Sequence, residues 1–348
     1  TITLRRKRRD PQYSDHESSS STGQIPVVSE SMPRGYTPAA PESIIQIIVD
    51  KLHWTIFQMK ALYYGSRIIR SERIEVVYGY ESWGAPAASL LGRMFDLPIV
   101  TRFQGTFLHP MIGNRLKLLT WFDKVIALKN KADLVVMTND GTKGKEVLSL
   151  FGVPDDRILF ITNGVIKDNE NNDNREKIRR GLGIQNDEPL LLTVSKLALW
   201  KRVDRVIQAM PMVLQECSNA TLLVVGEGSD KVRLARLAKK LGVEHAVKFM
   251  GGVQHEQVYQ YYHAADVFIS TYDLSNRGNP VLEALVNGAC IVTLADGSVD
   301  DIVVNGESGI LVDVESVSET LPSTILRLLQ DPELRCKLSQ GARKIARD

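Results

Sequence analysis

Short apolar segments alternate with helical segments along most of this chain, and this alternation restricts its fold more than any other feature. In the second half the apolar segments occupy residues 190–195, 220–226, 247–250, 267–270 and 290–293. Helical patterns separate them, as at 204–215 and 231–241. Strands that alternate with helices form a parallel sheet covered on both faces. The second half therefore predicts a complete doubly wound α/β unit.

The first half repeats this alternation less completely. A helical pattern over 43–69 precedes apolar strands, which lie at 74–78, 98–101, 132–137 and 157–162. A Rossmann-type unit normally opens with a strand and a glycine turn, and neither is visible before residue 43, where Ser, Pro, Gly and Glu are frequent. We therefore expect a flexible loop or linker over 1–42, a partial N-terminal Rossmann-like domain over 43–165, and a C-terminal one over 166–348.

Composition is typical of a soluble protein with two domains. Its 348 residues exceed one ordinary compact domain. A net charge of +2 argues against a nucleic-acid partner bound by a basic surface. The three cysteines are far apart and odd in number, which fits a reducing compartment and offers no metal cage. We expect a cytoplasmic protein.

One predicted helix, beginning near Asn279, has clear ends and a polar approach. Asn279 is a good N-cap, Pro280 suits the first helical position, and Gly288 suits a left-handed C-terminal cap. Glu283 stands at N4, one place too late for a capping box. Gly278 lets a ligand approach the first amides, where an anion gains from the helix dipole. We interpret this start as a phosphate site at which Glu283 grips the hydroxyls of a sugar; an exposed structural glutamate is the alternative.

Three further loops follow strand ends, where open α/β sheets bind their ligands. Lys196 and Lys201 precede a helix and suit a diphosphate, although ordinary surface lysines have the same pattern. Gly226 lies in a GxG turn that lacks the third glycine of a dinucleotide motif. Gly252 and Val253 form a turn where the backbone could approach a planar base.

In this order and spacing, the four loops resemble the retaining GT-B glycosyltransferases of family GT4, also called glycosyl transferases group 1. The resemblance runs from about residue 75 to the end and is strongest over 190–313. It implies two Rossmann-like domains that face a cleft, with a nucleotide-sugar donor on the second. The residues that it implies at the donor are Lys196, Lys201, Gly226, Gly252, Val253, Gly278, Asn279, Pro280, Val281, Leu282 and Glu283.

The chain departs from the family pattern at two places near the donor sugar. Ser275 stands where the first of two glutamates usually lies, and Asp273 is the candidate to replace it. Gln104 and Gly105 stand where a histidine and a glycine often face the donor sugar. We therefore expect Lys196, Lys201, Asp273, Ser275 and Glu283 to carry the reaction, with Gln104 and Gly105 on the acceptor or donor-sugar side.

The resemblance implies retaining transfer of a sugar from a UDP- or GDP-sugar to a glycan, a lipid-linked acceptor or a small molecule. It implies no cofactor and no metal, because lysines and helix amides would neutralise the leaving diphosphate. Two alternatives stay open. A non-catalytic nucleotide-sugar-binding subunit would fit Ser275, and a sugar-nucleotide epimerase would need an acid–base set that is not visible.

Basic and apolar residues are interleaved in the acceptor domain. The basic ones are Arg115, Lys117, Lys124, Lys129 and Lys131, and the apolar ones are Leu118, Leu119, Trp121 and Phe122. Such a mixture could dock the cytosolic face of a membrane that carries a lipid-linked acceptor. An ordinary amphipathic helix is the alternative.

Overall fold

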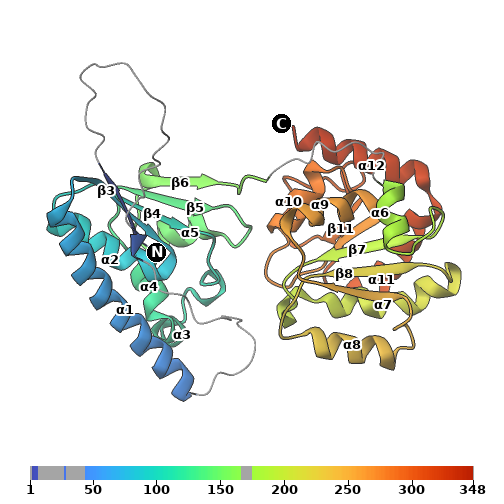
Figure 1. Ribbon diagram of the computed structural model, residues 1–348, viewed down its shortest axis with the longest axis horizontal. Coiled ribbons are helices and arrows are strands. Elements are labelled where there is room, and N and C mark those ends of the chain that lie inside the picture. The colour runs from blue at the N-terminus through green and yellow to red at the C-terminus, as the bar shows by residue number, and fades with distance from the viewer. Residues whose placement is uncertain (1, 7–26, 29–43, 166–174, 348) are drawn as a thin grey trace. The chain divides into compact units, whose positions relative to one another are not determined.

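A computed structural model describes residues 2–6, 27–28, 44–165 and 175–347. The chain divides into two compact units, Thr1–Thr162 and Asn163–Asp348, each built on its own six-stranded sheet (Figure 1). The junction lies three residues before the one expected from the sequence.

The sheet of the second unit is entirely parallel, with the order β12-β11-β10-β7-β8-β9. Its strands are β7 (Leu190–Val194), β8 (Thr221–Val225), β9 (Val247–Gly251), β10 (Val267–Ser270), β11 (Ile291–Leu294) and β12 (Ile310–Val312). All five expected strands are present, and β12 is one that the sequence analysis missed. The chain runs outward from β7 to β9 and then returns to β10, so β7 and β10 meet at a topological switch point.

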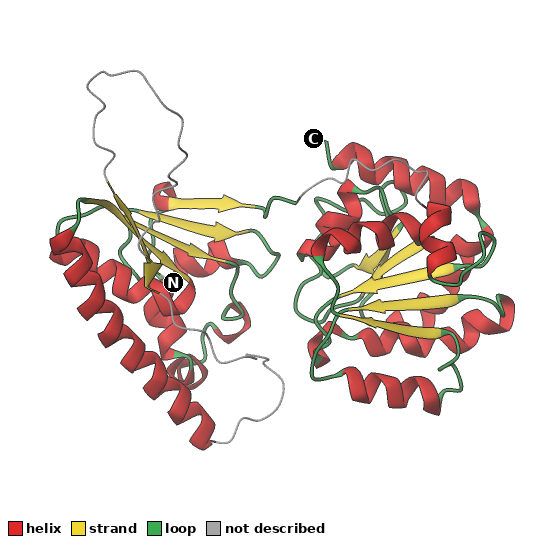
Figure 2. Ribbon diagram, viewed as in Figure 1, coloured by secondary structure: helices red, strands yellow, loops and turns green. Residues whose placement is uncertain are grey.

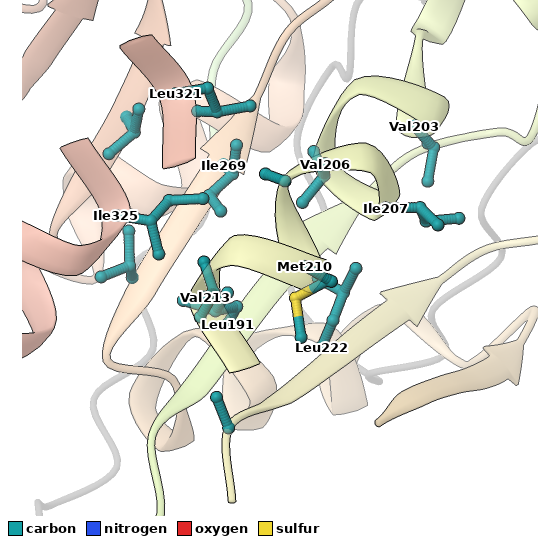
Figure 3. Packing of buried hydrophobic residues seen from close by; sticks show 14 of the residues in the cluster. Leu191, Val203, Val206, Ile207, Met210, Val213, Leu222, Ile269, Leu321 and Ile325 are labelled. Carbon is teal, nitrogen blue, oxygen red and sulfur yellow. The ribbon is translucent and has the colours of Figure 1, made fainter. Parts of the chain in front are cut away.

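Helices cover both faces of this sheet (Figure 2). They are α6 (Arg175–Gly181), α7 (Val203–Glu216), α8 (Lys231–Lys240), α9 (His255–Ala264), α10 (Asn279–Val286), α11 (Val317–Gln330) and α12 (Pro332–Ile345). One apolar cluster joins the sheet to α7, α8 and α11, and a second joins it to α6, α9, α10 and α12. Figure 3 shows part of the first cluster, where α7 and α11 meet the strands. Because both faces are covered, β7 and β8 are buried along their whole length and are almost wholly apolar.

The first unit has the strand order β2-β1-β3-β4-β5-β6, and its last four strands are parallel. These four are β3 (Ile74–Tyr80), β4 (Ile99–Phe103), β5 (Leu134–Thr138) and β6 (Ile158–Ile161), as expected. The helices are α1 (Ile44–Ser71), α2 (Glu81–Met94), α3 (Arg115–Thr120), α4 (Phe122–Leu128) and α5 (Gly144–Leu150), with 3-10 turns η1 (His109–Met111) and η2 (Asp155–Arg157). α2 packs on β3 and β4, and α1 packs on α2.

Two strands correct the expectation of a flexible segment over 1–42. β1 (Ile2–Arg6) pairs antiparallel with β3, and β2 (Val27–Val28) pairs with β1. The expected loop or linker began at residue 1, but Ile2 and Leu4 alternate with polar residues as a strand requires. The free edge of β3 supplies the partner. The remaining residues of 1–42 lie outside the described part of the chain.

Candidate functional site

The residues expected to bind a ligand follow strand ends at one edge of the second sheet. Lys196 and Lys201 follow β7, Gly226 follows β8, Gly252 and Val253 follow β9, and the segment from Thr271 to Gly278 follows β10. Parallel strands bring these carboxyl ends together. We call residues 195–202 and 271–278 the switch-point loops, because β7 and β10 are neighbours at the switch point.

The two switch-point loops are tied together. Asp273 N–H donates to Trp200 O at 3.0 Å, and the Thr271 hydroxyl donates to Arg202 O at 3.2 Å. Arg205, in the first turn of α7, donates to Thr271 O at 2.7 Å. The Asp273 carboxylate also pairs with Arg202 at 3.2 Å and with Arg205 at 2.9 Å. Two guanidinium groups therefore hold the carboxylate that we expected to contact a donor sugar.

The two candidate lysines have different surroundings. Lys201 ends the 3-10 turn η4 (Leu199–Lys201), and its Nζ lies 4.0 Å from the Trp200 ring centroid and 3.7 Å from that of Tyr272. Cation–π attraction at these distances holds the ammonium in place. Lys196 is exposed and forms no ion pair with another described residue. Lys201 is thus fixed by the protein, whereas Lys196 is available to an anion.

Asn276 closes the second switch-point loop. It is fully buried, and its Oδ1 accepts from Tyr272 N–H at 2.9 Å and from the Ser270 hydroxyl at 3.0 Å. Its Nδ2 donates to Tyr272 O at 3.1 Å and to Asp296 at 2.7 Å, and its N–H donates to Ser298 Oγ at 2.9 Å. This role of Asn276 was not predicted from the sequence, although the side chain of asparagine commonly bonds nearby backbone in turns.

Ser275 points into the protein. It is 8% exposed, and its hydroxyl accepts from Arg277 N–H at 3.1 Å. The Arg277 guanidinium, also buried, pairs with Asp301. Ser275 therefore shapes the turn before α10, where the family pattern has a glutamate.

The start of α10 leaves backbone amides open. Gly278 is its N-cap, one residue earlier than we expected, with Asn279 first in the helix. Among the described residues, no acceptor bonds the N–H of Gly278 or Asn279, whereas Val281 N–H donates to Gly278 O at 3.0 Å. A Cβ on Gly278 would meet nothing closer than 3.5 Å, so the chain itself does not require glycine there. The side chains of Val281 and Leu282 are buried, which leaves only their backbone for a ligand.

Gly226 and Gly252 differ in whether the fold requires glycine at that position. Gly226 has a φ of +131°, and a Cβ there would lie 1.8 Å from Ser195 O. Close packing of the loops after β7 and β8 therefore demands this glycine. An added Cβ on Gly252 would be 3.5 Å from Glu227, an ordinary contact. The fold therefore has room for a side chain at Gly252, which lies in a turn beside the half-buried Val253.

Glu283 is buried, which excludes the exposed glutamate that the sequence left as the alternative. It is 4% exposed, its Oε2 accepts from the Tyr262 hydroxyl at 3.2 Å, and its Oε1 lies 3.7 Å from His255 Nε2. Burial raises the pKa of the Glu283 carboxyl, while His255 and the Tyr262 hydroxyl act in the opposite direction. Tyr262 also donates to Pro280 O at 2.9 Å, so this cluster joins α9 to the first turn of α10.

In the first unit, Gln104 and Gly105 follow β4. Gln104 N–H donates to the Glu81 carboxylate at 2.6 Å, and a Cβ on Gly105, where φ is +117°, would lie 1.9 Å from Asp140. Glu81 follows β3 with a φ of +57°, and burial raises its pKa. Glu81 was not predicted from the sequence, because neither a left-handed backbone nor a buried carboxyl at a strand end has a sequence signature.

The described residues contain no group of three or more His, Cys, Asp or Glu side chains arranged to hold a metal ion. None of the helices in the described part combines the length and apolar character needed to cross a bilayer.

Comparison with known proteins defines the class. Residues 174–345, which lie in the second unit, match the family described as Glycosyl transferases group 1. The chain is 30% identical over 213 residues to an uncharacterized glycosyltransferase of Methanocaldococcus jannaschii, covering 60% of this chain and 54% of that protein. It is 31% identical over 271 residues to a D-inositol 3-phosphate glycosyltransferase of Acidothermus cellulolyticus, covering 75% and 58%. The chain thus spans between half and two thirds of the length of these relatives.

Solved structures agree on the fold. Anabaena HepE, crystallised with UDP, is similar with a TM-score of 0.68 and 20% identity, over 83% of this chain and 76% of that one. Sucrose-phosphate synthase from Thermosynechococcus elongatus has a TM-score of 0.66 and 18% identity, over 84% and 74%. The expected GT-B fold, with two Rossmann-like units, is confirmed.

Proposed function

We propose that this protein transfers a sugar from a nucleoside diphosphate sugar, with the donor bound at the switch-point loops of the second unit. The observation that carries the proposal is that a fixed cation, Lys201, and open backbone amides at the start of α10 occur on the same pair of loops. The Lys201 ammonium is held over two aromatic rings on the loops that also lead to the uncapped start of α10. Cations and helix N-termini are the groups that bind diphosphates.

The same groups account for the chemistry of the leaving group. When the bond between sugar and diphosphate breaks, negative charge develops on the diphosphate, and preorganised donors stabilise it. Lys196, Lys201 and the amides of Gly278 and Asn279 would supply that stabilisation without a metal ion or another cofactor. We propose transfer with retention of configuration, in which the leaving phosphate takes the acceptor proton, so no enzymic base is assigned.

A direct assay tests this proposal. The protein is incubated with UDP-glucose, other UDP-sugars and GDP-mannose, and release of the nucleoside diphosphate is measured with and without glycan, small-molecule and lipid-linked acceptors. UDP-sugars come first because HepE, which shares the fold, was crystallised with UDP-glucose. Release stimulated by an acceptor, with an α-linked product from an α-linked donor, supports retaining transfer. Inversion at the anomeric carbon contradicts it.

A second candidate is a non-catalytic nucleotide-sugar-binding subunit. It is favoured by one observation, the loss of an acidic donor-sugar contact, because Ser275 is buried and Asp273 is held by two arginines. This candidate predicts donor binding without turnover in the presence of every acceptor tested. An epimerase is not favoured by any contact at the site.

We also propose that the first unit contacts a membrane surface, on a smaller set of residues than the sequence suggested. Trp121 and Phe122 make edge-to-face contacts with other rings, and Lys124 donates to Ser82, so these three face the protein. Leu116 and Leu119 of α3 are 78% and 68% exposed. Arg115 and Lys117 lie beside them and are also exposed.

Apolar and cationic side chains on one short exposed helix suit the cytosolic face of an anionic bilayer, as a cytoplasmic enzyme with a lipid-linked acceptor would need. Co-sedimentation with phosphatidylglycerol vesicles should be lost in Leu116→Ser/Leu119→Ser, whereas Leu150→Ser, another exposed leucine, should retain it. Equal binding of all three proteins would contradict this surface.

A further inference from the structure

We propose that Arg202 is a positioning residue, which locks the two switch-point loops together and so fixes the Lys201 ammonium for the donor diphosphate. This inference rests on the proposed function and adds to it the residue that prepares the site before a donor arrives.

The backbone of Arg202 adopts a conformation that non-glycine residues seldom take. Its φ of 48° and ψ of 37° are left-handed, and it stands between the 3-10 turn that ends at Lys201 and the start of α7. Glycine adopts this conformation without the steric cost of a Cβ. A strained residue persists only where surrounding contacts hold it. The carbonyl of Arg202 accepts from the Thr271 hydroxyl, and its side chain supplies further contacts.

The guanidinium group of Arg202 joins two carboxylates on different elements. Its Nη1 donates to both oxygens of Asp273 at 3.2 Å, and its Nε and Nη2 donate to Asp204 at 3.2 Å. Asp204 belongs to the first turn of α7 and is 7% exposed, whereas Asp273 belongs to the loop after β10. The planar fork of arginine can serve two carboxylates at once, which the point charge of lysine does not match.

This bridge acts on Lys201 through the two aromatic rings that Lys201 contacts. Asp273 N–H donates to Trp200 O at 3.0 Å, and Tyr272 directly precedes Asp273. Trp200 and Tyr272 are the two rings against which Lys201 rests. A contact that fixes Asp273 therefore also fixes Trp200 and Tyr272, and these two rings determine the position of the Lys201 ammonium.

The same ion network offers a matched control outside the loops. Arg233 of α8 pairs with Asp230 at 2.6 Å and with Asp204 at 3.6 Å. Arg233 contacts neither switch-point loop through these carboxylates. Its removal takes one arginine from the network while leaving the Arg202–Asp273 bridge in place.

The test compares binding of UDP with that of uridine by calorimetry, or of GDP with guanosine if the wild type binds only that diphosphate. Arg202→Gly should weaken diphosphate binding at least about tenfold and nucleoside binding less than about twofold, with little change in melting temperature, because glycine relieves the strain. Arg202→Lys should show the same selective loss. Arg233→Gln should bind both ligands like the wild type.

Two further variants complete the test. If Arg202→Gly does not fold, Asp273→Asn probes the bridge from its other end and should show the same selective loss. When both fold, their double mutant should lose no more than Asp273→Asn alone, because that variant already removes the bridge to Arg202 together with the ion pair to Arg205. Additive losses, or rescue of binding by lysine at position 202, would overturn the inference.

Lys201→Ala separates this inference from the proposed function. A selective loss of diphosphate binding in Lys201→Ala, without one in Arg202→Gly, overturns the role of Arg202 and leaves the donor site standing. If the wild type itself binds diphosphate no better than nucleoside, the proposed function fails and this inference fails with it.

Discussion

At the scale of single residues, Lys201 and Glu283 lie at elements of the second unit that flank the switch point. Lys201 rests against Trp200, its neighbour in the chain, and against Tyr272, while Glu283 accepts a hydrogen bond from Tyr262. The two tyrosines are distant in sequence from the residues that they contact. For this reason the positions of Lys201 and Glu283 could be predicted from the sequence, whereas these contacts could not.

The first prediction concerns Glu283 and the donor ribose. Glu283→Gln keeps the shape and one acceptor but loses the charge, so donor binding should fall by about 1–2 kcal/mol. A 2′-deoxy donor should already lack this contact in the wild type, and the two losses should not add. Titration calorimetry of both donors with both proteins measures this. Additive losses would assign Glu283 to the structure alone.

The second prediction concerns the pH dependence of stability. Burial raises the folded-state pKa of Glu283 above its ordinary value of 4.5. The contribution of this group to the free energy of unfolding is therefore fully present below that value and is lost as the pH rises through the folded-state pKa. Glutamine does not titrate, so the stability of the wild type relative to Glu283→Gln should fall as the pH rises above about 4.5.

Urea unfolding of both proteins across this range provides the measurement, and titrations elsewhere in the chain cancel in the comparison. A difference that grows in favour of the wild type with rising pH would mean that the folded protein lowers the pKa of this carboxyl.

At the scale of elements, the alternating pattern predicted the parallel strands of both units, because each is a short apolar run with helical segments around it. β12 was missed because its three residues are too few to show a pattern. β1 was missed for another reason. Its pairing depends on the edge of β3, more than sixty residues away in sequence, and no local signal shows such a partner.

The glycines at the strand ends give a prediction at this scale. Gly226→Ala would place a Cβ 1.8 Å from Ser195 O at a φ of +131°, so it should lower the free energy of unfolding by more than about 2 kcal/mol. The added Cβ of Gly278→Ala meets only ordinary contacts, so this variant should lower the free energy of unfolding by less than about 1 kcal/mol. It should nevertheless weaken diphosphate binding, because the Cβ stands where a ligand would approach the first amides of α10. Denaturant unfolding and calorimetry together measure both effects. The reverse ranking of the two stabilities would contradict these assignments.

At the scale of the whole molecule, each unit has its own sheet and its own apolar clusters. The switch-point loops, Lys201 and the open amides of α10 all belong to the second unit, which also carries the family match. Binding of the proposed donor is therefore measurable without an acceptor.

Charge neutralisation by lysines and amides makes a prediction about metal ions. Transferase activity should be unchanged in the presence of EDTA, because the groups proposed to hold the diphosphate are cations and N–H donors, and none of them needs a bridging ion. Initial rates before and after chelation, with Mg²⁺ and Mn²⁺ added back, measure this. Activity that is lost on chelation and restored by either ion would show that a metal carries the leaving-group charge.

The central claim, that the switch-point loops bind the diphosphate of a nucleotide, is tested most directly by thermal unfolding with a panel of ligands. UDP, GDP, ADP, CDP and TDP are each compared with the matching nucleoside, for the wild type and for Lys201→Ala. A ligand that binds only the folded state raises the melting temperature with its concentration. We expect at least one diphosphate to stabilise the wild type far more than its nucleoside, and Lys201→Ala to lose about 1.5–3 kcal/mol of that preference. No stabilisation by any diphosphate, or an undiminished preference in Lys201→Ala, would contradict the claim.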